Sequence, residues 1–121
     1  MTKKKVYVAD DDPFILELIS IILNDKGYEV ITSPDGRSLE TLTEVPDLIL
    51  LDISMSGSDG SEICKKIKTN ASLPRRPVVL ISANRNIQEI ATGCGADDIL
   101  PKPFDIKDVI ALAEKYTAAA M

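Results

Sequence analysis

Four short apolar runs of this chain each lead, on their C-terminal side, into polar side chains suited to metal or phosphate chemistry. The runs span residues 6–9, 48–51, 78–81 and 99–100. The polar residues that follow them are Asp10, Asp11, Asp52, Ser82 and Lys102. If the runs are strands of one parallel sheet, all these groups emerge at the same edge. Three carboxylates, a hydroxyl and an ammonium there favour divalent-metal binding and phosphoryl transfer.

Converging carboxylates need a cation. Two carboxylates about 4 Å apart repel by roughly 4 kcal/mol at an effective dielectric constant near 20. Mg²⁺ suits such a site because it binds one or two carboxylates, waters and phosphate oxygens, and Mn²⁺ could replace it. Asp52 could then act as the nucleophile and form an aspartyl-phosphate. Lys102 would pair with one phosphate oxygen, and the hydroxyl of Ser82 would donate to another.

Each of these residues also has an ordinary structural explanation. Asp12, the third acid after the first run, precedes Pro13 and is better explained as a helix N-cap than as a metal ligand. Asp52 alone could be a strand-end acid, Ser82 could open a loop, and Lys102 could be a surface lysine. Their joint occurrence at strand ends is what favours a functional site.

The elements that must position these groups alternate regularly along the chain. Strands are expected at residues 6–9, 28–31, 48–51, 78–81 and 98–100. Helical spacing of apolar residues is found over 15–22, 87–94 and 106–113, and more weakly over 39–42 and 63–67. Uninterrupted β-branched runs are typical of strands buried on both faces of a parallel sheet. The pattern predicts an α/β fold, a single doubly wound (βα)5 domain with a parallel five-stranded sheet.

Composition narrows the functional classes. The 121 residues are expected to form one domain over 1–121, with no output domain attached. The net charge of −5 argues against nucleic-acid binding. No apolar stretch could span a membrane, and two widely separated cysteines predict free thiols in the cytoplasm. The chain has no histidine, so it cannot form a phosphohistidine, and any phosphate donor must be another molecule.

Six short motifs together resemble the receiver domain of bacterial two-component response regulators, in particular the stand-alone chemotaxis receivers. The motifs span residues 8–13, 50–55, 59–60, 81–83, 95–98 and 102–104. The resemblance covers the chain from Val6 to about Tyr116. It implies a flavodoxin-like fold with strand order 2-1-3-4-5 and a site at the switch between the first and third strands.

The resemblance also implies a role for each strand-end residue. Asp52 matches the phosphoacceptor, and Asp10 and Asp11 match the magnesium-binding acid pair. The remaining matches are the backbone carbonyl of Ser54 as a further metal contact, Ser82 as the switch hydroxyl, Lys102 as the phosphate-pairing lysine, and a cis Lys102–Pro103 bond.

The implied function is signalling rather than enzymatic turnover. A histidine kinase or a histidine phosphotransfer protein would phosphorylate Asp52, and a downstream protein would bind the switched surface. At most, the chain would phosphorylate itself from small donors and dephosphorylate itself. Docking of the donor protein against the first helix (Ile15, Leu18) and Pro103–Phe104 is expected from the same resemblance.

The chain departs from the family pattern at three places. Ser56, Gly57 and Ser58 follow Met55 where the family usually has a proline and a second apolar residue, so a more flexible loop is expected. The segment 84–93 is shorter than usual in the family by about two residues, which predicts a short or displaced fourth helix. Ile99 stands where the family generally carries an aromatic residue that rotates during switching, so a different readout is expected.

Two alternatives are open at this stage. One is a receiver that binds partners without phosphorylation, which Ile99 and the short fourth helix favour. The other is a phosphatase of the haloacid-dehalogenase type, with Asp10 as nucleophile and Asp97 and Asp98 as the final acids. The second leaves Asp52 without a role, and it places Lys102 after the last acids instead of before them.

Overall fold

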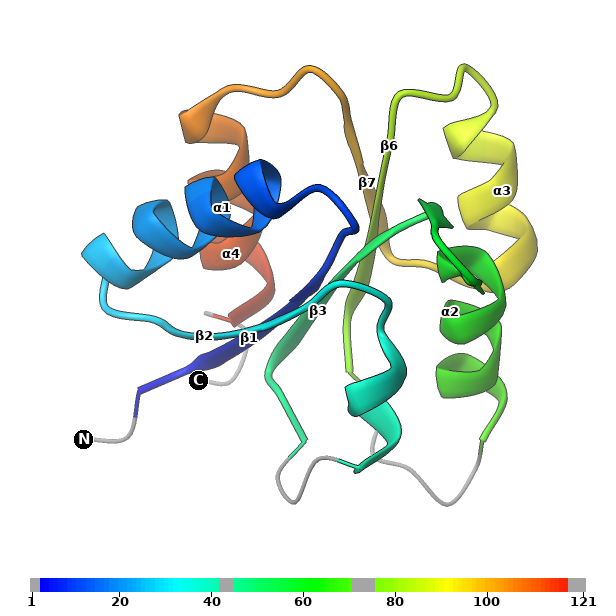
Figure 1. Cartoon of the computed structure of the whole chain (residues 1–121), viewed down its shortest axis with the longest axis horizontal. Coiled ribbons are helices and arrows are strands. Elements are labelled where there is room, and N and C mark those ends of the chain that lie inside the picture. The colour runs from blue at the N-terminus through cyan, green and yellow to red at the C-terminus, as the bar shows by residue number, and fades with distance from the viewer. Residues whose placement is uncertain (1–2, 42–44, 71–75, 118–121) are drawn as a thin grey trace.

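In the computed structural model, which describes residues 3–41, 45–70 and 76–117, a parallel sheet lies between two layers of helices (Figure 1). Its strands are β1 (Lys5–Ala9), β2 (Glu29–Ser33), β3 (Leu48–Asp52), β6 (Val78–Ser82) and β7 (Asp98–Pro101). They lie side by side in the order β2-β1-β3-β6-β7. β4 (Ser54–Met55) and β5 (Ser58–Asp59) belong to a separate hairpin, so the order is 2-1-3-4-5 when only the five parallel strands are counted. The predicted fold and strand order are confirmed.

The helices cover both faces of the sheet. Helices α1 (Pro13–Asp25) and α4 (Ile106–Thr117) lie on one face, and α2 (Gly60–Thr69) and α3 (Ile87–Cys94) lie on the other (Figure 1). The fourth crossover helix, α3, has eight residues and is short, as predicted. None of the helices in the described ranges is long and apolar enough to cross a bilayer.

One expected helix is absent from the described part of the chain. A 3-10 turn, η1 (Arg37–Thr41), occupies the place of the helix expected over 39–42, and Leu42 lies outside the described residues. Pro34 and Gly36 delay the start of any helix after β2, and too few apolar residues follow to form a stripe. A single turn therefore suffices to cover this corner of the sheet.

The central strands are buried because each face of the sheet has its own core. Successive side chains of a strand point to opposite faces, so Val6 and Val8 pack toward α1 and α4. Tyr7 and Ala9 pack on the other face with Cys64 of α2. All five residues of β3 and all five of β6 are buried, which is why both strands end in groups held at a fixed position.

The loops beyond the strand ends are built from local caps and turns. Asp12 caps α1 by accepting a hydrogen bond from the Phe14 backbone N–H at 2.9 Å, with Pro13 in the first turn, as predicted. The segment after Asp52, which we expected to be flexible, forms an antiparallel hairpin of β4 (Ser54–Met55) and β5 (Ser58–Asp59).

Candidate functional site

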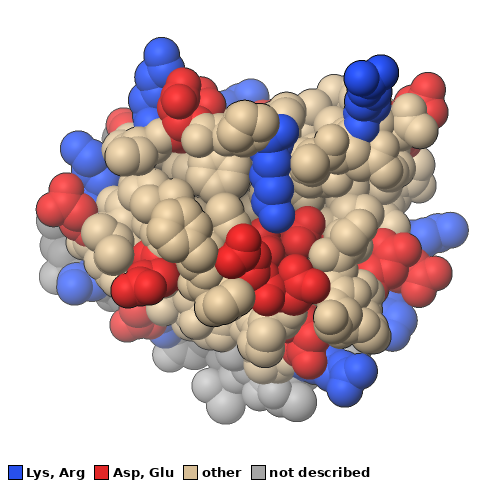
Figure 2. Space-filling model, turned by 45° about the horizontal axis from the view of Figure 1, so that its top comes forward, with Lys and Arg blue, Asp and Glu red and all other residues tan. Residues whose placement is uncertain are grey.

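The register between β1 and β3 brings Asp10 and Asp52 together. Ala9 of β1 lies opposite Leu51 of β3, so the residues that follow, Asp10 and Asp52, leave the sheet side by side. Carboxylate oxygens of Asp10, Asp11 and Asp52 all lie within 4.8 Å of one another. Asp10 and Asp52 are buried, whereas Asp11 is exposed. Figure 2 shows acidic side chains gathered around a basic side chain at the middle of this edge.

The basic group at the acidic cluster is Lys102, which is held by the neighbouring strand. Its backbone N–H donates to the Ser82 carbonyl oxygen at 2.9 Å, and its peptide bond to Pro103 is cis, as predicted. Its Nζ lies 3.0 Å from Asp10 Oδ2 and 3.6 Å from Asp52 Oδ2. Burial alone would lower the pKa of Lys102, but the two carboxylates outweigh it and raise that pKa. Lys102 is therefore a permanent positive charge at the site.

The surroundings of Asp52 favour the protonated, neutral form of its carboxyl group. Burial, and then the charge of Asp10, raise its pKa to about 6. Lys102 and the backbone N–H of Ser54 act in the opposite direction without cancelling that rise. A cation beside Asp52 would favour its charged, nucleophilic form at neutral pH.

Ser82 lies at the end of β6 with its hydroxyl partly engaged. Its side chain is buried, and its Oγ accepts a hydrogen bond from the Asn84 backbone N–H at 2.9 Å. Within the described ranges, no acceptor takes the hydroxyl proton of Ser82. That proton is available to a ligand at the same edge.

The donor set fits a hard divalent cation. Asp10 Oδ2 is fully buried and, although Lys102 Nζ is near, it accepts no well-directed hydrogen bond in the part of the chain that the structure describes. Asp10 Oδ1 accepts one from the Asp12 backbone N–H at 2.9 Å, which fixes the carboxylate. An oriented, buried oxygen among two further carboxylates suits Mg²⁺. The ligand role of the Ser54 carbonyl stays a prediction.

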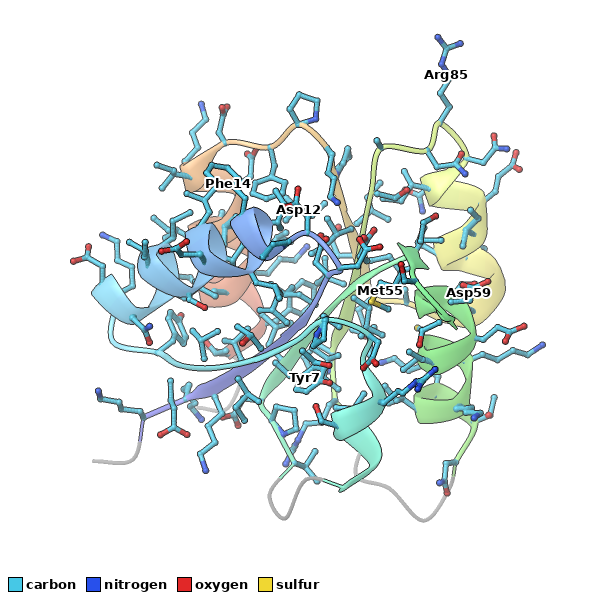
Figure 3. All side chains as sticks on the ribbon, in the orientation of Figure 1. Tyr7, Asp12, Phe14, Met55, Asp59 and Arg85 are labelled. Carbon is cyan, nitrogen blue, oxygen red and sulfur yellow. The ribbon has the colours of Figure 1, made fainter. Side chains whose placement is uncertain are left out.

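Residues 59–60 carry part of the family resemblance, but the contacts they make beside the site are visible only in the structure. The Gly60 N–H donates to the Ile53 carbonyl oxygen at 2.9 Å, and a Cβ on Gly60 would lie 2.0 Å from the Asp52 carbonyl oxygen. Asp59 caps α2 by accepting from the Ser61 N–H at 2.8 Å. Figure 3 shows Asp12 and Asp59 at the starts of α1 and α2, while Arg85 points away from the body of the protein.

The acids of the phosphatase alternative lie elsewhere. The Asp97 backbone N–H donates to the carbonyl oxygen of Val78, which begins β6, so Asp97 lies at the opposite edge of the sheet from Asp52. Its carboxylate binds Lys68 and the Val78 N–H, and that of Asp98 binds Tyr116. These acids cannot complete a catalytic set with Asp10.

The site geometry agrees with a sequence comparison against protein families. The family model of the response regulator receiver domain matches residues 6–114. The chain belongs to this family. The family is that of response regulators, and the match gives no support to the phosphatase alternative.

The curated relatives that this chain matches are longer proteins. The nisin biosynthesis regulatory protein NisR of Lactococcus lactis is 38% identical over 114 residues, which cover 91% of this chain and 48% of that protein. The DNA-binding response regulator MtrA of Mycolicibacterium smegmatis is 31% identical over 113 residues, which cover 90% of this chain and 48% of that protein. The chain thus spans about half the length of the curated relatives it matches. Absence of nucleic-acid binding stays a prediction for this chain.

A solved receiver structure has the same fold over nearly its whole length. The chemotaxis response regulator CheY4 of Vibrio cholerae superposes with a TM-score of 0.84 at 26% identity, covering 95% of this chain and 99% of that one.

Proposed function

We propose that this receiver accepts a phosphoryl group on Asp52 from the phosphohistidine of a partner protein. The observation that carries the proposal is the convergence of buried Asp52 with Asp10, Asp11 and Lys102 at one sheet edge. A structural role would not require three carboxylates within 4.8 Å of one another. The partner is a histidine kinase or a histidine phosphotransfer protein.

The transfer uses the side chains of this chain in distinct roles. A carboxylate oxygen of Asp52 attacks the phosphorus of the donor, an O–P bond forms, and the P–N bond to the donor imidazole breaks. The imidazole nitrogen keeps the bonding electrons and takes a proton from the surrounding water. Lys102 balances the charge on one phosphoryl oxygen. The hydroxyl of Ser82 donates a hydrogen bond to another.

Asp10, Asp11 and Asp52 would hold the metal ion, with Mg²⁺ preferred and Mn²⁺ as a substitute. When bound, the ion neutralises negative charge on the transferring phosphoryl group. The receiver is a phosphoacceptor and not a turnover enzyme, since the group remains on Asp52 until water removes it. We propose a cytoplasmic location, in keeping with two buried free cysteines, Cys64 and Cys94.

Phosphorylation would change the surface formed by the loops after β6 and β7. Drawing Ser82 and Lys102 toward a dianionic group moves both loops, because the Lys102 N–H is bonded to the Ser82 carbonyl. Ile99 is half-buried on β7 and has no aromatic ring to rotate. We propose that the readout depends on loop displacement, which a downstream protein recognises.

The donor protein would dock beside the site. A hollow lined mainly by apolar side chains lies between α1 and the loop after β7, and its lining includes Ile15, Leu18 and Phe104. Lys102, whose Nζ lies 3.6 Å from Asp52 Oδ2, lines the same hollow, so the hollow lies beside the acidic site. Phe14 stands exposed on α1 next to this surface (Figure 3).

Mass spectrometry after incubation with Mg²⁺ and phosphoramidate tests the main proposal. We expect a mass increase of one phosphoryl group, which is lost in Asp52→Ala and in the presence of EDTA. A matched control, Asp47→Ala, changes an acid at the other end of β3 and should keep the increase. No increase with any small donor would overturn the proposal and favour a receiver that binds partners without phosphorylation.

A second experiment tests the docking surface. Phe14→Ala should slow phosphoryl transfer from a phosphorylated histidine phosphotransfer protein while leaving uptake from phosphoramidate unchanged. Ile21→Ala, on the same helix and exposed at 60%, serves as the matched control. Equal rates for all three proteins would contradict docking at this surface.

A further inference from the structure

The tip of the hairpin formed by β4 and β5 reaches back to the exposed acid of the site through a backbone hydrogen bond. The Ser56 N–H donates to Asp11 Oδ2 at 3.2 Å, across 45 positions of sequence. Asp11 is the exposed member of the acidic set, whereas the other two members are buried. Its carboxylate would otherwise be free to turn into solvent.

The geometry of the hairpin fixes the direction of this N–H. Ser54 pairs with Asp59 and Met55 with Ser58, so Ser56 and Gly57 form the tip. Gly57, the second of the two tip residues, has a φ of +74°, while Ser56 does not have a positive φ; this is the pattern of a type II turn, whose second central position requires the left-handed conformation that glycine adopts at little cost. Met55 is buried and anchors the base of the hairpin in the core.

Ser56 stands where receivers usually carry a proline. Proline has no backbone N–H and could not make this hydrogen bond. The bond from Ser56 to Asp11 is thus available to this chain because of its own sequence.

We infer that the Ser56 backbone N–H positions Asp11 for metal binding, an inference that rests on the proposed function. A carboxylate has about four lone-pair positions, so one hydrogen bond to Oδ2 leaves acceptor capacity for a cation. The bond fixes the exposed side chain at the mouth of the site before the ion arrives. Less conformational entropy is then lost on binding, which strengthens metal affinity.

The same bond makes the hairpin responsive to the metal. If hairpin closure favours metal binding, metal binding must favour hairpin closure by the same factor. The tip that contains Ser56 and Gly57 therefore becomes more protected when the metal site is filled. In this chain, occupancy of the acidic site is communicated to the β4–β5 hairpin through Asp11.

Isothermal titration with MgCl₂ of the unphosphorylated wild type, Ser56→Ala and Ser56→Pro tests the inference. Ser56→Ala keeps the N–H and should bind Mg²⁺ within twofold of wild type. Ser56→Pro removes it and should bind about 3- to 10-fold more weakly. Equal or tighter binding by Ser56→Pro than by Ser56→Ala would overturn the inference. If wild type takes up a phosphoryl group and binds Mg²⁺ normally, that result leaves the proposed function standing.

Hydrogen exchange of the Ser56 amide, followed by NMR, gives a test that does not depend on folding of the proline variant. We expect exchange in wild type to slow on adding MgCl₂, and to show no such slowing in Asp11→Ala. Unchanged exchange in wild type with saturating MgCl₂ would overturn the inference. Absence of any Mg²⁺ binding to wild type would instead count against the proposed function itself.

Discussion

Lys102 Nζ lies closer to Asp10 than to Asp52, at 3.0 Å against 3.6 Å. One ammonium therefore serves two buried carboxylates in the absence of a phosphoryl group. Asp10 holds the lysine at the rim of the site, ready to pair with an oxygen attached to Asp52. The arrangement also makes Lys102 important for stability, because its removal leaves two acids without a compensating charge.

Replacing Lys102 should destabilise the metal-free protein. For Lys102→Met we expect a loss of about 1–3 kcal/mol in the free energy of unfolding at pH 7.5, since the buried acids lose their partner. Urea denaturation of wild type and Lys102→Met in EDTA measures this difference in the free energy of unfolding. Lys107→Met, an exposed lysine of α4, should change the free energy by less than about 0.5 kcal/mol. Equal stability of the two variants would contradict the assigned ion pairs.

Stability should depend on pH through Asp52. Its pKa is raised from 3.8 to about 6 by burial and by Asp10, so the folded protein binds the proton more tightly than the unfolded chain does. The stabilising contribution is fully present below about pH 4 and is lost as pH rises through 6, by about 3 kcal/mol in total. Asp52→Asn should lack this loss, and should exceed wild type in stability at pH 7.5 in EDTA.

The difference in unfolding free energy between wild type and Asp52→Asn, measured from pH 4 to pH 8, isolates this group from the other acids. A difference that does not vary with pH would show that Asp52 has an ordinary pKa in the folded protein.

Two cysteines distant in sequence lie together in the core. Cys64 Sγ is 3.6 Å from the Cys94 carbonyl oxygen, and burial raises the pKa of Cys64 to about 12. We expect both thiols to react very slowly with iodoacetamide at pH 8 in the folded protein and rapidly in urea. An added surface thiol, Lys65→Cys, should react at an ordinary rate. Fast labelling of Cys64 in the native protein would contradict its burial.

The sequence predicts the sheet well because its central strands are buried on both faces. Such strands are recognisable in the sequence as unbroken apolar runs. Because the strands are parallel, the polar residues that follow them come together at the same edge of the sheet. The boundary of β2 was less accurate: expected over 28–31, it spans Glu29–Ser33. Tyr28 lies before the strand and hydrogen-bonds to Thr117, and buried Ser33 extends it, neither of which a hydropathy pattern marks.

The details of the site depend on contacts that local patterns do not encode. The bond from Ser56 to Asp11 depends on how a hairpin folds, and the closer approach of Lys102 to Asp10 than to Asp52 is a difference of less than an ångström. The expected helix near Leu39 failed because its two apolar residues are too few to define a face. Sequence could name the reactive groups, but the positions of the backbone around them needed the structure.

The close approach of Gly60 to the phosphoacceptor strand is the feature we expect to be least tolerant of change. A Cβ at this position would lie 2.0 Å from the Asp52 carbonyl oxygen and 2.8 Å from its carbon. Backbone atoms cannot turn aside as a flexible side chain can, so Gly60→Ala must displace the start of α2 or the end of β3. We expect a loss of more than about 2 kcal/mol in unfolding free energy, together with weaker phosphoryl uptake.

Gly93→Ala is the matched control because it makes the same chemical change in a helix with open space around it. Nothing lies within 4 Å of a Cβ at Gly93, which is exposed in α3. This variant should be more stable than wild type by roughly 0.5–1 kcal/mol, since alanine favours helical backbone over glycine. Thermal unfolding should therefore shift in opposite directions for the two variants. If Gly60→Ala retained wild-type stability and phosphoryl uptake, contact between α2 and β3 at Asp52 would not constrain the site.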